Sequence, residues 1–235
     1  GIYQEIWNAL GLKGTEITDE LNLTFKDGAQ WTYFGLSEKE EKASGLASIA
    51  TIAKRISSVT LLDGGIINLF DKNIQSKWKE IGLLDVWSEL ANVNHDYVRI
   101  GDLKGSGGIF RLDLDAENKQ NSDMIFIESS SDGGQHFIEP YNMELLESVS
   151  PTNTLTFALQ EALPEGGKLV SFAEKQNIYG QSLFDYELEI DSRDIASGDQ
   201  ISDIKYDSWS EDQDNWQFNA EDYVGGKEWF IKRVT

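Results

Sequence analysis

The stretch that decides the fold runs from residue 97 to residue 139 and reads YVRIGDLKGSGGIFRLDLDAENKQNSDMIFIESSSDGGQHFIE. Short runs rich in Ile, Phe, Val and Met alternate there with turns rich in Gly, Asn and Ser, a pattern typical of β-strands. We expect strands at Tyr97–Ile100, Ile109–Leu114, Met124–Glu128 and His136–Ile138. Because short turns commonly join antiparallel neighbours, the stretch predicts an antiparallel β-meander.

The residues before this stretch predict helices and one hairpin. Apolar side chains recur at helical spacing within 2–10, 37–56, 74–81 and 87–91. The second of these segments opens with Ser37-Glu38-Lys39-Glu40, a capping box that satisfies free amides at a helix start. Between the first two, Leu21–Phe25 and Trp31–Leu36 alternate like strands around the turn signal Asp27-Gly28, which predicts a β-hairpin.

The last third of the chain predicts mainly strands. They are expected at Leu155–Leu159, Leu169–Phe172, Leu183–Ile190, Ile204–Trp209, Trp216–Phe218 and Trp229–Val234. Ser150-Pro151 marks a boundary, since Pro ends a helix and holds its predecessor extended. The fold class is therefore α+β, with N-terminal helices and a meander in a lobe at 1–149 and a β-rich acidic lobe at 150–235. One continuous domain is the alternative. No internal repeat stands out.

Charge restricts the partners. The chain has 235 residues and a formal net charge of −21, so its surface repels phosphate backbones and anionic lipids. Cations, basic proteins and neutral ligands held by aromatic faces are the partners that suit such a surface, and of these we favour a basic protein. The alternative is that the acidity only confers solubility. No apolar stretch reaches the roughly 20 residues that cross a bilayer. The chain has 0 Cys, which excludes disulfides, thiolate zinc sites and iron–sulfur clusters and leaves the compartment open.

The segment from Asp185 to Asp222 is the most acidic part of the chain and is interleaved with aromatic residues. Carboxylates fixed beside Trp and Tyr suit a protein interface, because the charges speed encounter and the rings anchor it. The predicted partner-binding residues are Asp207, Trp209, Glu211, Asp212, Asp214 and Trp216. In the alternative reading, the two Trp residues lie in a core under a solvated acidic surface.

A calcium site is a second candidate. Asp113, Asp115 and Glu117 stand at the alternating offsets that calcium loops use. An EF-hand is excluded, because its sixth and twelfth positions would be Asn118 and Met124 instead of Gly and Glu. A simpler calcium site with ligands from elsewhere, or a solvated strand end, remains.

Catalytic patterns are weak. The Gly-rich run Gly101–Gly108 lacks the Lys-Ser/Thr pair that follows the last Gly of a phosphate loop, so a turn is favoured. His95 and His136 do not form a His-Glu-x-x-His pair, and no Gly-x-Ser-x-Gly elbow occurs. The sequence therefore leans away from an enzyme.

One stretch resembles the SMI1/KNR4-type immunity fold. Arg99–Leu114 contains an Ile-Gly-Asp segment, a Gly-rich turn and a strand ending in Asp-Leu, and Met124–Glu128 and Phe137–Val149 follow as in that family. The family's acidic-Leu-Gly-Leu-Pro run is absent, since Leu10-Gly11-Leu12 is followed by Lys13. The resemblance implies an acidic protein that neutralises a basic toxin.

Together these patterns favour a non-enzymatic acidic interaction protein that binds a basic protein, in an inhibitor or immunity-type role. The alternative is a carbohydrate-binding module, with or without calcium, or a carboxylate-based glycan hydrolase.

Overall fold

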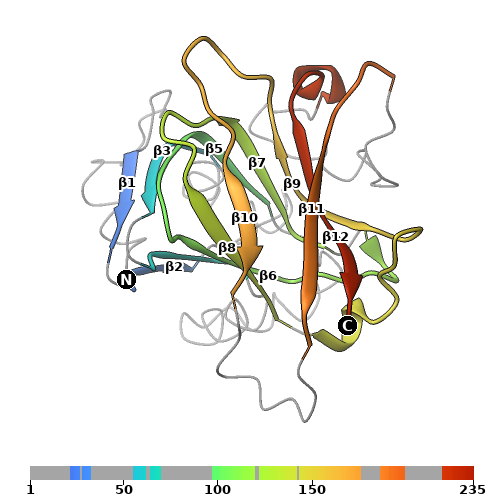
Figure 1. The fold of residues 1–235 in the computed structure, drawn as a ribbon. Helices are drawn as coiled ribbons and strands as arrows, with labels where there is room; N and C mark the ends of the chain where they lie inside the picture. Colours follow the sequence, from blue (N-terminus) through green and yellow to red (C-terminus); the bar gives the residue numbers. More distant parts are fainter. Residues whose placement is uncertain are drawn as a thin grey trace, which may run out of the picture.

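The computed structural model describes residues 22–26, 28–32, 55–61, 64–69, 97–119, 122–141, 143–175, 186–198 and 219–235. These residues form two β-sheets that share one core, together with two short 3₁₀ helices, η2 (Met143–Leu146) and η4 (Ala220–Tyr223) (Figure 1). No α-helix occurs among them.

Sheet A has seven strands. Their spatial order is β1 (Asn22–Phe25), β3 (Arg55–Leu61), β5 (Tyr97–Gly105), β7 (Met124–Ser129), β9 (Leu155–Gln160), β12 (Lys227–Val234) and β11 (Leu188–Asp194). The first five are parallel, whereas β12 is antiparallel to both β9 and β11. The antiparallel pair β11–β12 therefore ends a parallel sheet. We call this pair the hairpin, although η4 and a long connection separate its two strands in sequence.

Sheet B has five strands and is parallel throughout. Their spatial order is β10 (Ser171–Glu174), β8 (Gln135–Pro140), β6 (Ile109–Leu112), β4 (Ile66–Asn68) and β2 (Gln30–Thr32). Odd-numbered strands up to β9 lie in sheet A and even-numbered strands up to β10 in sheet B. From β1 to β10, the described strands therefore follow a coil in which each turn adds one strand to each sheet.

A repeated corner connects the sheets. At every passage from sheet A to sheet B the sequence has a small polar or acidic residue, then Gly, then Gly or Ala: Asp27-Gly28-Ala29, Asp63-Gly64-Gly65, Ser106-Gly107-Gly108, Asp132-Gly133-Gly134 and Glu165-Gly166-Gly167. The first Gly has a positive φ in all five corners, between 64° and 80°, a region that L residues with a side chain avoid. The coil thus has an internal repeat.

The main core lies between the two sheets. Strands of sheet A contribute Val98, Ile100 and Ile127, and those of sheet B contribute Phe110 and Ile138, all fully buried. A smaller buried cluster, which includes Phe126, Leu159 and Tyr223, covers the other face of sheet A beside η4.

The structure corrects the predicted fold class. Each strand expected within the described residues overlaps an observed one, although β10 and β11 begin only at Ser171 and Leu188. The antiparallel meander is wrong, since β5 to β8 alternate between two parallel sheets. The reason is visible at Met124–Ile127, where four consecutive residues are buried. A strand buried on both faces is typical of a parallel sheet. A meander with one solvated face would alternate instead.

The N-terminal expectations are corrected where residues are described. The predicted hairpin is wrong, because β1 pairs with β3 in sheet A and β2 pairs with β4 in sheet B. The end of the predicted helix at 37–56 is strand β3 from Arg55 onward. The rest of that segment, the helices expected at 2–10, 74–81 and 87–91, and the strands expected at 204–209 and 216–218 lie outside the described residues.

Strands from both sides of Ser150-Pro151 contribute to the same sheet. β7 precedes this dipeptide and β9 follows it, and the two are neighbours in sheet A. Leu146 and Val149 before it, and Leu155 after it, belong to one core.

Candidate partner-binding surface

The six residues predicted to bind a partner, Asp207 to Trp216, lie outside the described residues. The described parts of the acidic segment are 186–198, which includes β11, and 219–222, at the start of η4.

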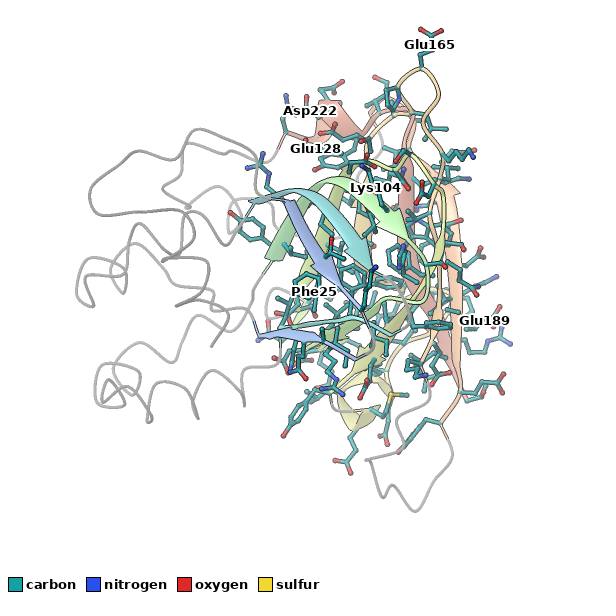
Figure 2. The ribbon with its side chains drawn as sticks, turned by 90° about the vertical axis from the view of Figure 1, so that its left-hand side faces the viewer. Phe25, Lys104, Glu128, Glu165, Glu189 and Asp222 are labelled. Atoms are coloured by element: carbon teal, nitrogen blue, oxygen red, sulfur yellow. The ribbon has the colours of Figure 1, made fainter. Side chains whose placement is uncertain are left out.

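Carboxylates of the β11–β12 hairpin face cations on the neighbouring strand. Lys227 Nζ lies 2.8 Å from Asp194, and Lys232 Nζ lies 3.6 Å from Asp191 and 3.8 Å from Glu189. Glu189, on the outer side of the hairpin in Figure 2, is also 3.8 Å from Arg233 Nε. These pairs are largely exposed, so each contributes little stability. They nevertheless leave the hairpin surface with mixed charge.

One carboxylate of the hairpin is buried. Glu228 on β12 is 1% exposed and accepts hydrogen bonds from Thr156 Oγ1 and Arg193 Nε. Arg193 stands directly opposite Glu228 in the β11–β12 register. A buried charge requires such partners, because water no longer solvates it. Glu228 is therefore a structural group that ties β9, β12 and β11 together.

A second acidic region surrounds Tyr223 in η4. Burial raises the pKa of the Tyr223 hydroxyl far above its usual range, and the charge of Glu161 adds to the effect. Glu128 and Asp222 raise it further, whereas Arg99 lowers it. Glu128 and Asp222 lie at the same end of the molecule in Figure 2. Arg99 forms a 3.4 Å ion pair with Glu128, so this region is partly neutralised.

The predicted calcium ligands lie in the connection after β6. Asp115 Oδ1 accepts the backbone N–H groups of Glu117, at 3.0 Å, and of Asn118, at 2.9 Å. Asp113 donates its own N–H to Asp123 Oδ2, at 2.7 Å. The Asp115 carboxylate thus closes a local turn, as Asp commonly does. Among the residues that the structure describes, no three His, Cys, Asp or Glu side chains converge as metal ligands would.

This connection packs against η2. The Ala116 N–H donates to the Leu145 carbonyl at 2.9 Å. Met143 and Leu146 of η2 pack against the core, and Leu145 points outward with 43% of its surface exposed. Tyr141, at the end of β8, is 45% exposed. A short helix with two inward side chains thus holds an apolar side chain in solvent.

Carboxylates flank these apolar side chains. Glu144 and Glu147 are exposed, and the Tyr186 hydroxyl donates to Glu147 Oε1 at 3.0 Å. This hydrogen bond raises the pKa of Tyr186, and the charges of Glu147 and Glu144 add to it. We define the η2 surface as Tyr141, Glu144, Leu145, Glu147 and Tyr186. The sequence analysis did not single out this surface, although apolar residues between carboxylates at 141–147 are its signal.

The described histidine is not placed for catalysis. His136 on β8 is fully buried between the sheets, where Phe110 and Phe172 surround it. Its Nδ1 accepts the Gly108 N–H at 3.2 Å. His95 lies outside the described residues.

Comparisons with known proteins identify no relative. No protein-family profile, curated protein or solved structure matches this chain. Within the described ranges, no helix has the length and apolarity needed to cross a membrane.

Proposed function

We propose that this chain is a non-enzymatic interaction protein that binds a basic protein, as an inhibitor or immunity protein does. The observation that supports the proposal best is the net charge of −21 on a folded scaffold. Fixed carboxylates lose little entropy when a cationic partner docks, and their field speeds the encounter. His136, one of the chain's 2 histidines, is fully buried and so does not contact a substrate.

The charges of the described surface are unevenly distributed. The hairpin carboxylates Glu189, Asp191 and Asp194 have Lys or Arg partners on β12. Glu221 and Asp222 are exposed at η4 and form no ion pair with another described residue. A cationic partner is therefore expected to favour the surfaces where carboxylates lie exposed, at Glu221 and Asp222 of η4 and at Glu144 and Glu147 beside η2, over the hairpin.

The test is capture of a partner followed by measurement of its salt dependence. The immobilised chain is exposed to extracts of its source at physiological salt, and each captured protein is purified and titrated by calorimetry. We expect a protein with a net positive charge that binds at least tenfold more weakly at 0.5 M than at 0.15 M salt, since screening shortens the range of charge attraction. A neutral or acidic partner, or salt-independent binding, would contradict the proposal. A sugar that changes Trp fluorescence would favour the carbohydrate alternative.

A further inference from the structure

Exposed apolar side chains are rare in the described part of the chain and concentrate at η2. The large hydrophobic residues exposed among the described residues are Tyr141 at 45%, Leu145 at 43% and Leu163 at 45%. Two of the three belong to the η2 surface. Leu163 lies instead in the corner between β9 and β10, two residues before Glu165, which Figure 2 shows at the tip of that corner.

The structure holds Leu145 outward on a fixed backbone. Its neighbour Leu146 is fully buried and Met143 packs against the core, so η2 is anchored from within. The Leu145 carbonyl accepts the Ala116 N–H, which ties η2 to the loop after β6. Tyr141 is tied to the end of β6, just before that loop, since its N–H donates to the Leu112 carbonyl at 3.0 Å. An apolar side chain fixed in this way costs little ordering entropy on binding.

The charges at this surface are negative. The charged groups that act on the Tyr186 hydroxyl are Glu147 and Glu144, and both raise its pKa. Glu117, which is also exposed, follows directly after Ala116 in the adjoining loop. The η2 surface therefore places exposed carboxylates beside exposed apolar side chains.

We propose that the η2 surface is the docking site for the basic partner. The inference rests on the proposed function and makes it more specific. The partner segment presents an aliphatic or aromatic side chain flanked by Lys or Arg: the apolar group packs on Tyr141 and Leu145, and the cations lie beside Glu144 and Glu147. An apolar centre inside a polar rim is the usual anatomy of a protein interface.

Two capped peptide probes test the surface. One is Lys-Lys-Leu-Lys-Lys, and the other replaces its Leu with Lys. The intact chain is titrated with each at low salt by fluorescence anisotropy. We expect the Leu-containing peptide to bind more tightly by about tenfold, although it carries one charge fewer. Leu145→Ser should abolish that preference, whereas Leu163→Ser, a matched change at a side chain of similar exposure, should retain it.

Charge and location are tested separately. Glu144→Lys with Glu147→Lys should weaken both peptides at least tenfold, and Glu165→Lys should have a much smaller effect. Because the chain has no Cys, Leu145→Cys and Leu163→Cys can each carry one benzophenone label, and the Leu-containing peptide should cross-link from position 145 alone. Circular dichroism and melting temperature establish that each variant folds, and the cross-link supplies a readout that does not depend on affinity.

The outcomes separate the two proposals. If no change at η2 alters the affinity of either peptide, and both positions cross-link equally, the docking site is overturned and the basic-partner function stands. If neither peptide binds at low salt, the docking site and the basic-partner function are both overturned.

Discussion

His136 Nδ1 accepts the backbone N–H of Gly108 across 3.2 Å of buried space, which fixes the ring proton on Nε2. His136 Nε2 has no hydrogen-bond partner in the structure and lies in an apolar environment beside Phe110 and Phe172. Protonation of Nδ1 would replace this acceptor with a donor that faces the Gly108 N–H. The bond therefore requires a neutral imidazole.

The first prediction follows from that bond. Burial lowers the pKa of His136 from 6.5 to about 4. Between these two pH values the imidazole is protonated in the unfolded chain and neutral in the folded chain. This group does not affect stability above its unfolded pKa. Stability should fall between pH 6.5 and pH 4, by about 3 kcal/mol at most. Urea unfolding at several pH values measures it, and His136→Phe should remove this part of the pH dependence. His95→Gln is the control, and a pH dependence unchanged in His136→Phe would refute the assignment.

The second prediction concerns Glu228. Arg193→Ala leaves the buried Glu228 carboxylate with Thr156 as its hydrogen-bond donor, and should cost about 2 kcal/mol of unfolding free energy. Arg193 is itself half exposed, so water limits the loss. Glu228→Gln with Arg193→Ala should recover part of it, since an amide needs no counterion. Denaturant unfolding of the single and double variants gives the coupling. Additive losses would mean that the pair is not linked.

Most of the described strands could be predicted from the sequence, although β3 and β4 were not, and the pairing of the strands could not be predicted. Runs such as Met124–Ile127 contain the β-branched and aromatic residues that strands prefer, and their positions are confirmed. The same run also carried the signal for a parallel sheet, because it lacks a polar residue at alternate positions. The meander was expected because a short Gly-rich connection indicates a hairpin. Here such connections turn the chain from one sheet into the other.

The candidate site could be predicted only in its chemistry. Negative charge beside aromatic residues is evident in the sequence, but which carboxylates meet cations depends on strand register, as for Asp191 and Lys232. Leu145 also illustrates the limit. Its sequence neighbour Leu146 is fully buried, and the difference arises from how a single helical turn sits on the core. The recurring corners, each a small polar or acidic residue followed by Gly and then by Gly or Ala, were the overlooked signal of the coil.

The third prediction tests why these corners need Gly. Gly134 has an ordinary φ, but a Cβ there would lie 2.0 Å from the carbonyl oxygen of Gly105, the residue just before the preceding corner. Gly166 has a φ of +77° and open space around its Cβ position. Gly134→Ala should therefore cost about 3 kcal/mol through the steric clash, and Gly166→Ala about 1 kcal/mol through backbone strain alone. Thermal and urea unfolding measure both. Equal losses would show that stacking of the corners does not require close approach.

The last prediction concerns calcium at Asp113, Asp115 and Glu117. Asp115 already accepts two backbone N–H groups, so a cation would have to share or replace them. Asp115→Ala should lower stability by about 1 kcal/mol through loss of this turn. Millimolar calcium screens the −21 charge of any variant, so the melting temperatures of the native chain and of Asp115→Ala should rise equally. Magnesium at equal concentration should act in the same way. A calcium-specific rise that disappears in both Asp115→Ala and Glu117→Gln would instead establish a binding site, because a ligand that binds only the folded state stabilises it by an amount that grows with the ratio of its concentration to its Kd.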